Sequence, residues 1–116
     1  MLINGDEDAA NNFTRGFYTV GSCIINYLLD RIRLEVEKCS DLQGFIFYHS
    51  IGGGTGSGLG SLLYEMLSLY DENIPKFSFP VFPSEKMSTS TVEPYNAILS
   101  LKRLVVYNDV CIVLDN

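Results

Sequence analysis

Residues 52–58 form a run in which five of seven positions are glycine, with Thr55 and Ser57 between them. Because glycine has no Cβ, the backbone N–H groups of such a run can come close to a bound molecule. Apolar residues at helical spacing follow directly, and the start of a helix leaves unpaired N–H groups and a partial positive charge. A phosphate group is the ligand that this combination favours. The run therefore predicts an anion-binding loop, and the alternative is a tight turn with positive φ at one or two glycines.

The register of the glycines excludes two common phosphate-binding motifs. The P-loop pattern G-x-x-x-x-G-K-S/T needs lysine at position 59, where the chain has Leu59. The dinucleotide pattern G-x-G-x-x-G finds no register, because Ser57, Leu59 or Ser61 always falls at its third glycine. A dinucleotide oxidoreductase with an unusual loop is therefore an alternative that lacks its usual fingerprint.

Three polar side chains lie within or just before the glycine run. Thr55 and Ser57 supply hydroxyl groups that can donate to an anion or cap the helix. His49 is the single histidine of the chain and stands between an apolar segment and the loop. No base, acid and nucleophile accompany it, so we expect a hydrogen-bonded support residue rather than a catalyst.

Alternating strands and amphipathic helices surround the loop and predict an α/β fold, a Rossmann-like parallel sheet with flanking helices. Periodicity and turn residues place helices over 17–39 and 59–70 and from Pro94 onward, and strands over 45–48, 77–82 and 110–114. The continuous apolar run at 45–48 is typical of a strand buried on both faces. Pro80 weakens the strand at 77–82, because it cannot donate to a ladder.

Spacing also predicts which side chains of the helices meet neighbours. On the helix over 17–39, Arg31 and Glu35 stand four residues apart, as do Arg33 and Glu37, so each pair can form an ion pair. The apolar residues of that helix point inward, at Ile25, Leu28, Leu29, Ile32, Val36 and Cys39. The inner face of the helix that Pro94 opens is expected to carry Tyr95, Ile98 and Leu99.

Composition and charge narrow the class of protein. The chain has 116 residues, 47% of them hydrophobic and 19% charged, which suits one globular domain. A net charge of −6 argues against a surface that binds nucleic acid or acidic membranes, so an anion must be held by backbone donors. Cys23, Cys39 and Cys111 lie in apolar stretches and form no C-x-x-C pair, which predicts buried free thiols in a reducing compartment. With no apolar run near the ~20 residues that span a bilayer, the cytosol is expected.

Four motifs together resemble the tubulin family, and the resemblance covers essentially the whole chain. The glycine run at 52–58 matches the signature loop of that family, and residues 7–12 (EDAANN) resemble its α-type phosphate loop. Residues 88–89 and 92–96 resemble the segment beside the sugar, and residues 115–116 resemble the pair that reaches the base. They occur in the family's order with family-like spacing.

The resemblance implies a GTP site with Mg²⁺. It assigns the phosphates to Ser50, Gly53, Gly54, Thr55 and Gly56, the metal to Asp8 with Ala10 and Asn11 beside it, the ribose to Thr89 and Glu93, and guanine to Asn116. Simpler roles are open for three of these. Asp8 can belong to a solvated acidic turn, Glu93 can complete a capping box with Ser90, and Asn116 can be a frayed end. Pro94 favours ribose binding, because it should keep Glu93 outside the helix.

Within the family the chain is most like α-tubulin, and it diverges at several positions. Ala9 and Ala10 favour the α type, whereas residues 101–104 (LKRL) and 113–116 (VLDN) resemble γ-tubulin. Asp6, where α-tubulins usually have lysine, is a further departure, as is the proline within the strand at 77–82. The resemblance thus implies a divergent α-like paralogue.

For the intact protein the resemblance implies a cytoplasmic subunit of α/β heterodimers and microtubules. Residues 1–116 would be an incomplete half of its GTP-binding domain, in which Leu2 and Ile3 end a strand. Whether it is an enzyme stays open, because the residue that activates water comes from the second half of a neighbouring subunit, and α-tubulin does not turn over its own GTP. The alternatives are a bacterial division protein of the same superfamily and an inactive fragment. The inactive-fragment alternative depends on two missing strands, which would leave the strand at 45–48 with an unpaired edge.

Overall fold

The computed structural model of the chain describes residues 2–84 and 91–116. Its helices and strands are, in chain order, η1 (Arg15–Thr19), α1 (Val20–Glu37), β1 (Phe45–Ser50), η2 (Thr55–Leu59), α2 (Gly60–Tyr70), β2 (Lys76–Phe82), α3 (Glu93–Tyr107), β3 (Val110–Cys111) and β4 (Leu114–Asp115). The elements η1 and η2 are π-helical turns that run directly into α1 and α2. The predicted alternation of strands and helices is confirmed.

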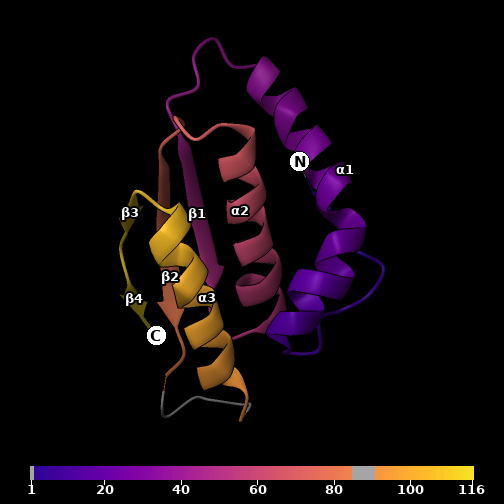
Figure 1. Cartoon of the computed structure of the whole chain (residues 1–116), viewed down its shortest axis with the longest axis vertical. Helices are drawn as coiled ribbons and strands as arrows, with labels where there is room; N and C mark the ends of the chain where they lie inside the picture. Colours follow the sequence, from indigo (N-terminus) through magenta and orange to yellow (C-terminus); the bar gives the residue numbers. More distant parts are fainter. Residues whose placement is uncertain (1, 85–90) are drawn as a thin grey trace.

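The strands form one parallel sheet in the order β1-β2-β3, with β4 also pairing with β2 (Figure 1). The single strand expected at 110–114 is instead divided into β3 and β4. The backbone of Ser78 faces this side of β2, because its carbonyl accepts from the Ile112 N–H at 2.9 Å. Pro80, two residues further on, faces the same side and has no N–H to donate. The ladder is interrupted at that point.

Strand β1 lies at the edge of the sheet, because β2 is its only partner in the described part of the chain. The unpaired edge that the resemblance implied is therefore present. The expectation that Leu2 and Ile3 belong to a strand is wrong, since both lie outside the strands and Leu2 is 86% exposed.

The helices cover only one face of the sheet (Figure 1). Phe45 and Phe47 point toward them, whereas Ile46 and Tyr48 are 60% and 72% exposed on the opposite face. The ring of Tyr48 stacks there on Phe79, with centroids 4.8 Å apart. The expectation that 45–48 is buried on both faces is wrong, because the described chain supplies no layer for the second face.

A compact apolar cluster joins the sheet to α2 and α3. It consists of Ile51, Tyr64 and Leu104, with Phe47, Phe82, Ala97, Leu101 and Tyr107 packed against them. On α3 the buried stripe is Asn96, Ser100 and Leu104. The expected inner residues Tyr95, Ile98 and Leu99 are exposed instead. Small and polar side chains occupy the close contacts of this helix, so hydrophobicity alone pointed to the wrong side.

Two further expectations about side chains are wrong. Cys23, Cys39 and Cys111 are free but exposed, because each lies on the side of its segment that no other described element covers. On α1 the ion pairs join Arg33 to Asp30 at 3.5 Å and Lys38 to Glu35 at 3.1 Å, with the acid first in each. They replace the predicted pairs of Arg31 with Glu35 and Arg33 with Glu37.

Within residues 2–84 and 91–116, no helix combines the length and the apolar character needed to cross a bilayer. The longest described helix, α1, has 18 residues and carries ion pairs on its exposed side.

Candidate functional site

The helix after the glycine run begins earlier than its sequence suggested. Helical structure starts at Gly54 rather than near Gly58, and the Ser57 N–H donates to the Gly53 carbonyl at 3.2 Å. The N–H groups of the first turn, which precede Ser57, have no carbonyl available within their own helix. Ser57 itself is buried and donates its hydroxyl to the Gly53 carbonyl, so of the two hydroxyl groups within residues 52–58 only that of Thr55 is exposed.

Backbone packing explains three of the five glycines. A Cβ on Gly54 would lie 2.5 Å from the backbone nitrogen of Asn12. A Cβ on Gly56 would lie 2.2 Å from the backbone carbonyl oxygen of Ser50, and one on Gly58 would lie 2.4 Å from that of Phe13. No glycine among the described residues has positive φ, which rules out the tight-turn alternative. These three glycines make room for neighbouring chain segments rather than for a ligand.

Gly53 is different, because a Cβ built on it meets no atom within 4 Å. It therefore faces open space at the point where the helix begins. A bound anion would find the bare backbone of Gly53 and the free N–H groups of the first turn in one place.

The turn at residues 8–12 packs against the glycine run. Ala10 and Asn11 adopt left-handed backbone angles, with φ of 50° and 57°. Such angles are unusual for alanine and mark a turn that its surroundings hold in place. Ala9, buried at 1% exposure, would touch a Cβ on Gly54 at 3.0 Å. Asp8 is exposed and accepts from the Ala9 N–H at 2.8 Å.

Asn96 joins these two segments, a role that no motif of the sequence indicated. Its Nδ2 donates to the carbonyls of Asn11 at 2.8 Å and Gly52 at 2.9 Å, and its Oδ1 accepts from the Phe13 N–H at 3.1 Å. The side chain is only 3% exposed. The available signal was its place three residues after Glu93, on the same face of α3 as Ser100 and Leu104.

Of the residues expected near the ribose, the structure describes Glu93 but not Thr89. Glu93 is the first residue of α3 rather than outside it, and its Cδ lies 3.7 Å from a Cβ built on Gly52. Pro94 occupies the first helical turn, where its missing N–H is tolerated, so it does not exclude Glu93. Thr89 and Ser90, and with them the capping-box alternative, lie outside the described residues.

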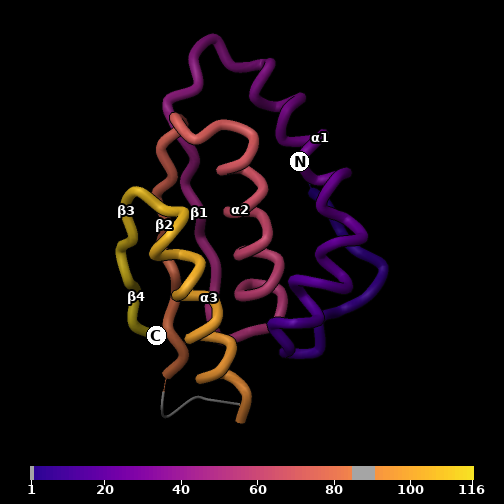
Figure 2. The backbone as a smooth tube through the Cα atoms, viewed as in Figure 1, coloured from indigo at the N-terminus to yellow at the C-terminus, as the bar shows by residue number. Residues whose placement is uncertain are grey.

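Asn116 follows β4, whose Asp115 pairs with Phe82 at the end of β2. It therefore lies at the carboxyl edge of the sheet, where β1 ends at Ser50. Figure 2 shows that the starts of α2 and α3 gather near this same end. Open α/β sheets bind ligands beyond the carboxyl ends of their strands.

His49 links the end of β1, just before the glycine run, to α2 through both of its ring nitrogens. Its Nε2 lies 2.9 Å from the Tyr64 hydroxyl and its Nδ1 lies 3.3 Å from the Ser50 carbonyl. Burial lowers the pKa of His49 from its ordinary value of 6.5 and raises that of Tyr64. A neutral imidazole that accepts from Tyr64 and donates to Ser50 fits both partners, which is the support role expected.

The electrostatics of the site favour backbone donors. Residues 50–60 contain no lysine or arginine, and Arg15 near the start of η1 is paired with Glu7 at 3.1 Å. Among the described residues no group of three or more His, Cys, Asp or Glu side chains could hold a metal. A single carboxylate such as Asp8 still fits Mg²⁺, which commonly combines one or two carboxylates with phosphate oxygens and water.

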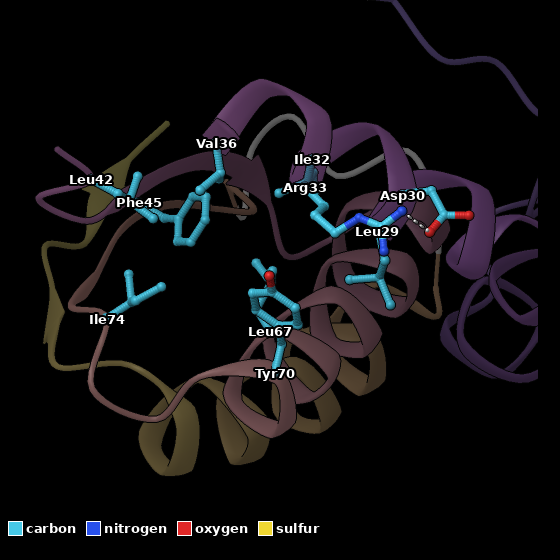
Figure 3. Close-up of a pocket in the computed structure, with 10 residues that line it drawn as sticks. All are labelled: Leu29, Asp30, Ile32, Arg33, Val36, Leu42, Phe45, Leu67, Tyr70 and Ile74. Atoms are coloured by element: carbon cyan, nitrogen blue, oxygen red, sulfur yellow. Dashed lines mark ion pairs between the residues drawn. The ribbon is translucent and has the colours of Figure 1, made fainter. Parts of the chain in front are cut away.

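A separate apolar cavity of about 190 Å³ lies between α1 and α2 (Figure 3). Its lining consists of Leu29, Ile32, Val36, Leu42, Phe45, Leu67, Tyr70 and Ile74, with the Asp30–Arg33 ion pair at one side. Phe45 begins β1, so the cavity lies toward the amino end of the strand and away from Gly53. It is not part of the candidate anion site.

Comparison with known protein families matches residues 1–116 to the Tubulin/FtsZ family, GTPase domain. The chain belongs to this family. It is 57% identical to the tubulin alpha chain of the nucleomorph of Guillardia theta and 55% identical to the tubulin alpha-3 chain of Zea mays. Each match covers the whole of this chain but only 26% of the relative, so the chain spans about a quarter of their length. The predicted tubulin family, with its α-like character, is confirmed.

Proposed function

We propose that these residues form the phosphate-binding part of a GTP site in an α-tubulin-like protein. The observation that carries the proposal is Gly53, which faces open space at a helix start in a chain of the Tubulin/FtsZ GTPase domain. Free N–H groups at a helix start bind phosphate without any cationic side chain, which suits a chain of net charge −6.

The proposed contacts follow the elements that meet at the carboxyl edge of the sheet. Phosphates are assigned to Ser50, Gly53, Gly54, Thr55 and Gly56, Mg²⁺ to Asp8 with Ala10 and Asn11 beside it, the ribose to Thr89 and Glu93, and guanine to Asn116. An amide suits the base because it donates and accepts together. Mg²⁺ would neutralise phosphate charge beside Asp8.

For the whole protein we propose a structural role in the microtubule cytoskeleton of the cytoplasm, as a partner in α/β heterodimers. Support comes from the two relatives, both of them tubulin alpha chains at more than half identity. The proposal concerns GTP binding and assembly, and it assigns no hydrolytic residue to this chain.

The direct test is titration with a fluorescent GTP analogue, with and without Mg²⁺, in two proteins. One is the 116-residue chain, and the other is a chimera in which it replaces the matching segment of the Zea mays relative. We expect weak binding by the chain, because its sheet edge and open face lack their neighbours, and tight Mg²⁺-dependent binding by the chimera. Displacement by NAD but not by GTP would overturn the proposal, as would a chimera that folds without binding GTP.

A matched pair of glycine substitutions locates the site. In Gly53→Ala the new methyl group points into open space, so it should weaken binding about tenfold with little effect on folding. In Gly60→Ala the methyl group meets only the His49 ring at 3.5 Å, and binding should be unchanged. Equal binding by both variants would show that the anion lies elsewhere.

A further inference from the structure

The side chain of Asn96 holds together two loop segments through hydrogen bonds to their backbone groups. Its three hydrogen bonds reach two segments that are far from it in sequence, at residues 11–13 and at Gly52. Phe13 stands at the start of the helical segment that continues through η1, where backbone N–H groups lack partners within the helix. Asn96 supplies that N–H with an acceptor from another element.

The chemistry of these contacts requires an amide. Two carbonyls need donors and one N–H needs an acceptor, and asparagine is the smallest side chain that supplies two N–H donors together with an acceptor oxygen. At 3% exposure water cannot easily replace the side chain, so its removal would leave buried backbone groups unpaired. An aspartate of the same shape would turn negative oxygen atoms toward the Asn11 and Gly52 carbonyls.

The two segments that Asn96 joins are the ones assigned above to the phosphates and to the metal. We propose that Asn96 is a positioning residue, which fixes the turn at 8–12 against the glycine run and so sets the spacing of the proposed contacts. This inference rests on the proposed function. Because the 8–12 turn is the side assigned to Mg²⁺, an error in that spacing should affect a triphosphate more than a diphosphate.

The test compares Asn96→Asp with Asn108→Asp in both the chain and the chimera. Asn108 follows the same helix, and its Nδ2 donates to the Ser78 hydroxyl at 3.0 Å, away from the loops. Both changes exchange an amide for a carboxylate, so they share any general cost in stability. Asn96→Ala, which introduces no buried charge, serves if Asn96→Asp does not fold.

Two measurements separate positioning from mere structural support. Hydrogen exchange of the Phe13 amide should become about tenfold faster in the Asn96 variants, with the change confined to residues 9–16 and 52–58. In the chimera, GTP affinity should fall about tenfold and GDP affinity clearly less, whereas Asn108→Asp leaves the ratio of the two unchanged.

The outcomes are distinguishable. Uniformly faster exchange, unchanged exchange at Phe13, or equal losses for GTP and GDP would each overturn the positioning role. A folded chimera that binds no GTP would overturn the proposed function instead, and hydrogen exchange at Phe13 would then decide alone whether Asn96 holds the two segments together.

Discussion

At the scale of single residues, the absence of a side chain has two different meanings in the glycine run. Gly54, Gly56 and Gly58 are glycine because backbone lies where a Cβ would be, and only Gly53 is open. The sequence predicted the anion loop, and the resemblance assigned Gly53, Gly54 and Gly56 to the phosphates without separating these two meanings. It also missed Asn96, because nothing in a single sequence says that an amide on a helix reaches backbone more than forty positions away.

Two alanine substitutions in this run should therefore change stability by very different amounts. Gly56→Ala places a methyl group 2.2 Å from the Ser50 oxygen, and the forced backbone shift should cost about 1–3 kcal/mol. Gly53→Ala should change the free energy of unfolding by less than about 0.5 kcal/mol. Urea denaturation of both variants measures this, and similar losses would contradict the packing described.

The left-handed turn offers a second test at this scale. Ala10→Gly removes a Cβ from a residue at φ 50°, a conformation that costs an alanine about 1–2 kcal/mol. The greater chain entropy of glycine returns about 0.5–1 kcal/mol of this, so a small net gain in stability is expected. Ala9→Gly, at a buried residue, should lose stability under the same urea denaturation. A loss from Ala10→Gly as large as that from Ala9→Gly would contradict the turn geometry.

His49 should make the chain sensitive to mild acid. Its pKa is lowered in the folded chain by burial, so below about pH 6.5 the unfolded chain binds a proton that the folded chain does not. Stability from this group is complete above that pH and declines as the pH falls through the window beneath it. Denaturation midpoints at about pH 7.5 and about pH 5.5 should differ for the native chain and differ less for His49→Gln. An equal difference in both would assign the effect to other groups.

At the scale of elements, periodicity predicted the helices and strands but not how they are turned or divided. Helix α3 illustrates the first limit, because its inner stripe contains Asn96 and Ser100, which a hydrophobic pattern cannot select. The divided last strand illustrates the second. Its interruption depends on Pro80 in the neighbouring strand, and that pairing is visible only once the sheet is known.

The orientation of α3 can be measured with two truncations. Leu104→Ala removes a side chain that is 1% exposed in the apolar cluster and should cost about 2–5 kcal/mol. Ile98→Ala, on a side chain that is 66% exposed, should cost less than about 0.5 kcal/mol. If the Ile98 variant were the less stable of the two in urea, the inner face expected from the sequence would be correct after all.

At the scale of the whole molecule, the sheet has one face and one edge without cover from the described chain. The exposed face presents Ile46, Tyr48 and Phe77, and β1 leaves backbone groups unpaired along its outer side. The resemblance anticipated the edge, because it implied strands from elsewhere in the protein. The open face was missed, because a continuous apolar run does not reveal whether a second layer of helices is present.

The isolated chain should therefore associate with itself as its concentration rises. Tyr48→Lys places a charge on the open face and should shift sedimentation toward the monomer, at a cost in stability of no more than about 1.5 kcal/mol for the lost stack on Phe79. Phe47→Lys, on the covered face, should unfold the chain instead. Unchanged association in a folded Tyr48→Lys variant would show that another surface is responsible.

The interruption at Pro80 gives the two ends of the proposed site unequal freedom. Asn116 is attached through a ladder of two residues, whereas the glycine run is clamped by backbone contacts on several sides. The guanine ring of a bound nucleotide would therefore contact a weakly held segment, whereas the phosphates would contact a rigid one. Most of the ordering entropy of nucleotide capture should therefore fall on the segment around Asn116, and less of it on the glycine run.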